Sequence, residues 1–189
     1  MRGMPLCLAA LACLGVLTLA SCDQELVLVT DVEDHSLSTK SFRAHVGETG
    51  GFGLVTVNAP TTPSKTEVDN LLASKITVTG AYHVKITPAE DRVDMNRIVL
   101  VFNPPLARGR MNPDRICSGK IGPIAAQPEA GALRIYGVVC ASDRVVSHAM
   151  TLSYDIAPGD PRFAEVAKAL SLALFPIKPY GDRSDCNFC

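Results

Sequence analysis

Aromatic side chains are scarce in this sequence: they make up 5% of its 189 residues, and tryptophan is absent. Surfaces that bind sugars or stack nucleic-acid bases are usually built from such rings, so the composition argues against both classes of protein. The charges also nearly cancel, with 18 Lys and Arg against 19 Asp and Glu and a formal net charge of -1. No broad positive field is available to hold a phosphate backbone, and we predict no nucleic-acid partner.

Motifs of the common site chemistries are missing as well. No two histidines have the spacing that places two metal ligands on one helical face, and we expect them singly on exposed faces: His35, His45, His83 and His148. The glycine-rich residues 47–53 lack the Lys-Ser/Thr pair of a phosphate-binding loop and contain no dinucleotide fingerprint. We therefore predict a turn at residues 47–53, and neither a metal nor a cofactor in the protein.

A hydrolase triad is weakly indicated by Ser147 and Ser153, which lie near His148 and Asp155 in the sequence. Adjacent residues of a strand point to opposite faces, and no Gly-x-Ser-x-Gly turn exposes a nucleophile. The pattern argues against a catalytic triad here, and hydrolysis involving His148 remains only an alternative.

The amino end has the features of an export signal. Arg2 supplies a single positive charge, residues 5–20 are almost all small or aliphatic, and charged Asp23 follows Cys22. The apolar run is shorter than the roughly 20 residues that a bilayer-spanning helix needs, so cleavage is favoured over a permanent span.

This signal ends in a sequence that resembles the lipobox of bacterial lipoproteins, Leu19-Ala20-Ser21-Cys22. The resemblance implies that residues 1–21 are removed and that Cys22 carries the acyl chains that anchor the protein in a membrane. Asp23-Gln24 resembles the signal that retains enterobacterial lipoproteins in the inner membrane. It implies a cell-envelope protein that faces the periplasm, with the inner membrane favoured over the outer one.

One domain follows the signal, because the hydrophobic period changes several times without an internal repeat or a long polar linker. We expect residues 22–40 to contain the acylated cysteine, a tether and a first strand at residues 25–30. Residues 41–178 are predicted to form a single α+β domain, and residues 179–189 a polar tail that contains two cysteines.

Strands are predicted from alternating or continuous apolar residues. Residues 42–46 and 54–57 are expected to form a hairpin around Gly50-Gly51. The alternation is clearest from Ile76 to Ile86, and further strands are expected at residues 98–102, 133–140 and 150–156. The half-exposed patterns favour antiparallel pairing.

Two helices are indicated by capping signals. Ser64 and Glu67 form a capping box that predicts a helix over residues 65–74. Asp160 and Pro161 are typical of an N-cap and a first helical residue, and the apolar stripe that follows predicts a helix over residues 161–175. The expected fold is a mostly antiparallel sheet of five to seven strands, with one or two helices packed on one face.

Four cysteines besides Cys22 remain after the signal: Cys117, Cys140, Cys186 and Cys189. An even number in an exported protein indicates a disulfide framework, and its connectivity is not fixed by the sequence alone. A bond between Cys117 and Cys140 would contribute about 3.4 kcal/mol by the chain-entropy model. The last two cysteines form a Cys-x-x-Cys motif, for which a structural disulfide is favoured over a redox dithiol because no helix follows the first thiol.

The basic loop, residues 108–120, is the strongest local candidate for a binding site. It contains one carboxylate, Asp114, and four cations: Arg108, Arg110, Arg115 and Lys120. Guanidinium groups on a loop held by Cys117 could bind carboxylates or phosphates in a bidentate manner, although a solvated loop has the same composition.

The sequence therefore favours a membrane-anchored lipoprotein that is a non-enzymatic binding or assembly partner in the cell envelope. Its expected contacts are the membrane, through the lipid, and either an envelope protein or an anionic headgroup. The alternative is a small periplasmic enzyme, with thiol redox chemistry at the Cys-x-x-Cys motif or with hydrolase activity.

Overall fold

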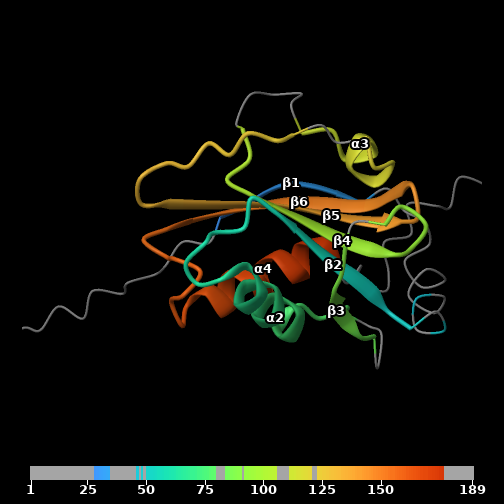
Figure 1. Cartoon of the computed structure of the whole chain (residues 1–189), viewed down its shortest axis with the longest axis horizontal. Helices are drawn as coiled ribbons and strands as arrows, with labels where there is room; N and C mark the ends of the chain where they lie inside the picture. Colours follow the sequence, from blue (N-terminus) through green and yellow to red (C-terminus); the bar gives the residue numbers. More distant parts are fainter. Residues whose placement is uncertain are drawn as a thin grey trace, which may run out of the picture.

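A six-stranded sheet runs through the middle of the protein, in the order β1-β6-β5-β4-β2-β3 (Figure 1). The computed structural model describes residues 28–34, 46, 48, 50–79, 84–90, 92–105, 111–120 and 123–176. The strands are β1 (Leu28–Asp34), β2 (Phe52–Val57), β3 (Ile86–Pro88), β4 (Arg97–Phe102), β5 (Ala132–Ala141) and β6 (Arg144–Tyr154). Among the described residues, no helix is long and apolar enough to span a membrane.

Most neighbouring strands are antiparallel, namely β1 with β6, β6 with β5 and β5 with β4. β2 differs, because it pairs in parallel with β4 on one side and with β3 on the other. The prediction of a mostly antiparallel α+β fold is confirmed. The predicted strands at 98–102 and 133–140 lie within β4 and β5. The strand predicted at 150–156 corresponds to the second half of β6, which ends at Tyr154, two residues before the predicted end. β6 begins earlier than predicted, at Arg144, because a tight turn at Ser142 and Asp143 joins it directly to β5.

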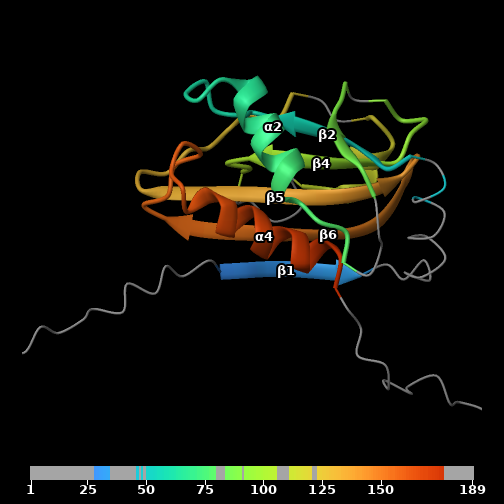
Figure 2. The same cartoon turned by 90° about the horizontal axis from the view of Figure 1, so that it is seen from below.

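Two helices, α2 (Lys65–Lys75) and α4 (Phe163–Leu174), cover one face of the sheet (Figure 2). The predicted capping box begins α2: the Ser64 backbone donates to Glu67 Oε2 at 2.9 Å, and Ser64 Oγ accepts from the Glu67 backbone at 3.4 Å. The predicted apolar stripe of α4 is buried against the sheet, and it consists of Phe163, Val166, Ala167, Leu170 and Leu174. This face therefore holds the larger apolar core.

The start of α4 differs from the prediction by two residues. Asp160 Oδ1 accepts from the Arg162 backbone at 2.9 Å, and the Phe163 backbone donates to the Asp160 carbonyl at 2.9 Å. The carboxylate thus caps a turn at Pro161 and Arg162, and the helix begins only after that turn.

The long strand predicted at residues 76–86 is wrong for most of its described length. Ile76 and Val78 are buried and Thr77 is exposed, as the alternation indicated, but this segment has no strand partner. The Ser171 side chain of α4 donates to the Thr77 carbonyl at 2.6 Å and accepts from the Thr77 backbone at 2.9 Å. An extended segment that crosses a helix has the same alternation as a sheet strand, and only β3 at its end joins the sheet.

The predicted hairpin between residues 42–46 and 54–57 is also wrong. Both sides of β2 are occupied, by β3 and β4, and Val46 is helical. The predicted turn is present, with positive φ at Gly50 and Gly51 (93° and 112°). A side chain at Gly51 would place its Cβ 1.9 Å from the Lys85 carbonyl oxygen, so glycine is required there. The first strand, β1, covers residues 28–30 of the prediction and continues to Asp34, while residues 25–27 and 42–45 lie outside the described part.

Candidate binding site

The opposite face of the sheet carries a short helix, α3 (Pro113–Cys117), at the end where β5 turns into β6 (Figure 1). Its sequence explains its formation: Asn112 Oδ1 accepts from the Arg115 backbone at 3.1 Å, and Pro113 occupies the first helical turn. The basic loop was expected to lack regular structure, so this helix corrects the prediction. Five residues are too few for a helix to be stable alone, and α3 therefore depends on its attachment to the sheet.

A disulfide provides one attachment. Cys117 in α3 is bonded to Cys140 in β5, with their Cα atoms 5.4 Å apart and a sequence separation of 23. Both cysteines are fully buried, in a second apolar cluster with Ile116, Val99 and Val138. The disulfide predicted for these two residues is thereby confirmed.

Arg97 provides a second attachment, although it was not identified from the sequence. Its side chain is completely buried at the start of β4, and its guanidinium donates to the Cys117 carbonyl at 2.6 Å and the Ile116 carbonyl at 3.3 Å. It also donates to the Ser142 carbonyl in the β5–β6 turn at 2.7 Å. A cation at the C-terminal carbonyls of a helix neutralises their partial negative charge. The only signal in the sequence is an arginine directly before the apolar strand of residues 98–102.

The outer surface of α3 carries two of the four predicted cations. Arg115 and Lys120 are exposed, whereas Ile116 and Cys117 face inward. The turn after α3 is closed by the Lys120 backbone, which donates to the Arg115 carbonyl at 3.0 Å, and the Arg115 guanidinium donates to the Lys120 carbonyl at 3.3 Å. Across the described segments neither cation forms an ion pair, so both can bind an external anion. Arg108 and Arg110 lie outside the described residues.

The other predicted cysteine sites lie outside the described residues. These are Cys22, the predicted lipidation site, and the Cys-x-x-Cys pair of Cys186 and Cys189. The structure therefore tests neither the lipid anchor nor the redox alternative.

The suggested hydrolase residues are not assembled into a triad. Ser147 Oγ donates to the Leu174 carbonyl at 2.7 Å, so it faces the α4 side of the sheet and connects β6 to the end of that helix. His148 faces the opposite side, where its ring lies 5.7 Å from that of Tyr136. The expectation that His148 is exposed is wrong, since it is only 8% accessible. No group of three metal-ligating side chains occurs in the part of the chain that the structure describes.

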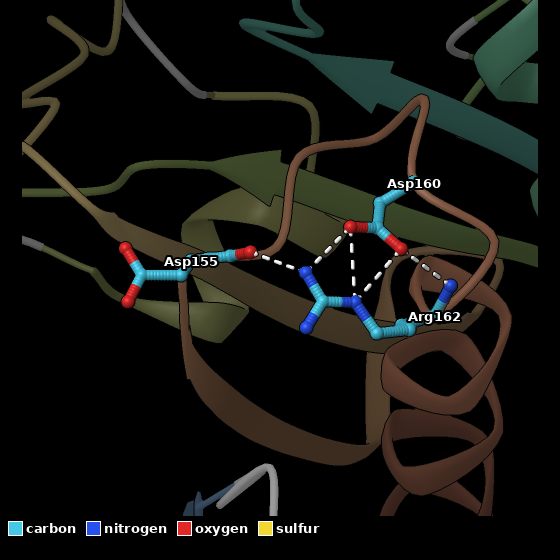
Figure 3. A network of polar contacts seen from close by, with 3 residues as sticks. All are labelled: Asp155, Asp160 and Arg162. Carbon is cyan, nitrogen blue, oxygen red and sulfur yellow. Dashed lines mark hydrogen bonds and ion pairs between the residues drawn. The ribbon is translucent and has the colours of Figure 1, made fainter. Parts of the chain in front are cut away.

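An open groove of about 390 Å³ lies between α2 and the turn before α4. Beside it, the Arg162 guanidinium donates to both Asp160 carboxylate oxygens, at 2.6 Å from Nη2 and 2.9 Å from Nε, and to the Asp155 carbonyl at 2.7 Å (Figure 3). The hydrogen bonds from Arg162 lower the pKa of Asp160 from its ordinary 3.8 to about 2. The groove itself is lined by two carboxylates, Glu67 and Asp160, and one cation, Lys75, so it is a weaker candidate for anion binding than α3.

Comparison with known proteins adds little to this site. No family model matches the sequence, and no curated protein matches it significantly. Among solved structures, the chain is similar to the PelC dodecamer from Paraburkholderia phytofirmans, with 14% identity and a TM-score of 0.38 over 80% of this chain and 99% of that one. This similarity is distant, and the function proposed below rests on the chain's own residues.

Proposed function

We propose that this protein is a lipoprotein of the bacterial cell envelope whose domain is a non-enzymatic binding partner. The anchor is the acylated Cys22, the domain faces the periplasm, and the Asp23-Gln24 pair supports the inner membrane as its location. The binding surface is α3 with its following turn, which presents Arg115 and Lys120 to a carboxylate- or phosphate-bearing partner.

The fixed position of α3 is the observation that carries this proposal. A five-residue helix that only connected two strands would not need both a buried disulfide and a buried arginine to hold it. Holding the backbone in place before binding reduces the conformational entropy that a partner must otherwise overcome. The backbone that carries the exposed cations is therefore fixed in position, as a specific anion-binding surface requires.

The distance between α3 and Leu28, where the described domain begins, favours a partner other than the membrane that holds the anchor. Leu28 at the start of β1 pairs with Leu152, which pairs with Arg134 of β5. From Arg134 to Cys140, where α3 is attached, β5 advances six residues, or roughly 20 Å at about 3.3 Å per residue. This separation favours an envelope protein as the partner of α3 over a lipid headgroup of the membrane that holds the anchor.

Charge removal tests the proposal. Arg115→Gln with Lys120→Gln should reduce crosslinking of the intact lipoprotein to its envelope partner, and wild-type crosslinking should fall as salt screens the contact. The matched control is Lys75→Gln with Lys168→Gln, which removes two positive charges from α2 and α4 on the other face. Thermal stability should change little in either variant, since exposed substitutions usually cost within about 0.5 kcal/mol.

Three results would oppose the proposal. Equal loss of crosslinking in both variants would indicate a general charge effect, and retained crosslinking in the α3 variant would exclude this surface. Absence of acyl chains on Cys22, measured by mass spectrometry of the mature protein, would remove the anchor.

A further inference from the structure

Large exposed apolar side chains are few in the described part of the chain, and two of the three lie beside each other. Leu28 is 44% exposed and Tyr154 is 55% exposed, while the third, Leu172 on α4, is 51% exposed. Leu28 pairs directly with Leu152, and Tyr154 follows two residues later on the same face of β6. Leu28, Leu152 and Tyr154 form what we name the end patch, at the end of the sheet away from α3.

The end patch is held rigidly by its surroundings. Tyr154 pairs with Ala132 of β5, and the next residue, Asp155, donates from its backbone to the Gly131 carbonyl at 2.7 Å. Arg162 holds the Asp155 carbonyl from the other side and is itself fixed by Asp160 (Figure 3). The tyrosine is therefore presented on a fixed strand end, and its exposure does not follow from a loose loop.

The chain brings the end patch close to the proposed anchor. Leu28 follows Cys22 by six positions, and six fully extended residue steps span at most about 20 Å. If acyl chains hold Cys22 at the membrane surface, the start of β1 cannot move far from that surface. The patch is then confined to a small volume next to the bilayer, so that even a weak apolar contact is favoured by a high effective concentration.

We infer that the end patch docks onto the lipid bilayer that holds the anchor, with Tyr154 at the headgroup level. Tyrosine is enriched at membrane interfaces because its ring is apolar and its hydroxyl remains hydrated. The exposed carboxylates nearby, Glu129 and Asp155, do not favour attraction to anionic lipid. Apolar contact is therefore the source of docking, and phosphatidylglycerol should not strengthen it. The inference rests on the proposed lipid anchor and adds an orientation in which the end of the sheet farther from α3 lies at the membrane.

The absence of tryptophan from the chain makes a direct test available. The intact acylated protein carrying Tyr154→Trp is reconstituted into phosphatidylcholine vesicles that contain brominated phosphatidylcholine. Docking should shift the emission to shorter wavelength, and the bromines should quench most of it. Leu172→Trp is the matched control, because Leu172 is similarly exposed but lies on α4, and its emission should stay that of a solvated indole.

A second tryptophan probe distinguishes the absence of docking from a folding defect of the Tyr154 variant. Leu28→Trp should report the same quenching as Tyr154→Trp, and both proteins should retain the Cys117–Cys140 disulfide. Unquenched emission at both positions, in protein shown by mass spectrometry to be acylated and by flotation to be vesicle-bound, would overturn the docking inference and leave the proposed function standing. Absence of acyl chains would overturn the lipoprotein proposal and the docking inference with it.

Discussion

The two faces of the sheet are held together by different physical means. On one face, α2 and α4 bury the larger cluster of apolar side chains, including Leu72, Phe163 and Leu170. On the other face, α3 contributes only Ile116 and Cys117 to a smaller cluster. There the disulfide and the buried Arg97 connect helix to sheet.

This difference shows where the chain has used covalent and polar bonds in place of hydrophobic area. The twelve-residue amphipathic helix α4 stays on the sheet because burying its apolar stripe outweighs the entropy lost. A five-residue helix cannot bury a comparable area. Its fixed position therefore requires other bonds, and it leaves an outer surface of charged residues available for contact with a partner.

Phe163→Ala should produce the largest loss of stability, because it removes a fully buried ring from the larger core. We expect the free energy of unfolding to fall by about 3–5 kcal/mol, measured by urea denaturation. Leu172→Ala, which shortens an exposed side chain of the same helix, is the control and should change it little. Similar effects of the two substitutions would mean that α4 does not carry the core as described.

Removal of the disulfide by Cys117→Ala with Cys140→Ala should cost about 3 kcal/mol. The loss should appear first as faster hydrogen exchange in α3, while the amides of α4 remain protected. Uniform loss of protection across both faces would contradict the division between them.

Arg97→Met should cost about 2 kcal/mol, because the Cys117 and Ser142 carbonyls lose their charged donor inside the protein. Hydrogen exchange in α3 should rise with the disulfide still intact, as shown by thiol titration. Arg144→Met at the exposed start of β6 is the matched control. Unchanged exchange in α3 would mean that the disulfide alone holds the helix.

Arg162→Gln should have the smallest effect, and it should be local. Because the folded-state pKa of Asp160 is depressed to about 2, its stabilising contribution is present above pH 3.8 and is lost as the pH falls toward 2. The substitution should return the pKa toward 3.8, measured by the carboxyl carbon shift in an NMR titration. Lys168→Gln, which removes the partner of Glu165, should leave the Asp160 pKa unchanged.

The sequence predicted those parts of the fold that depend on local patterns. The capping box at Ser64 and the apolar stripe from Phe163 to Leu174 specify their helices within a few residues, because the signals lie inside the helix itself. The strand predicted from Ile76 is wrong because Ser171, far away in the sequence, supplies the hydrogen-bond partner of the Thr77 backbone. No local pattern carries that information.

The candidate site was predictable in part for the same reason. Cys117 and Cys140 are recognisable as disulfide candidates by residue type, but the sequence leaves their pairing open, and the bond between them follows from the position of α3 beside β5. The burial of Arg97 and His148 depends on which strands lie beside them and on α3 above β4 and β5. Such contacts between distant segments cannot be deduced from spacing alone.

Site-specific photocrosslinking at position 114 tests most directly whether α3 is a partner surface held in place by its bonds to the sheet. A photoreactive amino acid replaces the exposed Asp114 in the full-length protein, which leaves Arg115 and Lys120 in place, and a second variant carries it at Lys168 on α4. We predict a defined crosslinked partner from position 114, none from position 168, and a marked loss of the adduct in protein with Cys117→Ala and Cys140→Ala. Equal crosslinking from both positions, or an undiminished adduct at position 114 without the disulfide, would contradict this account.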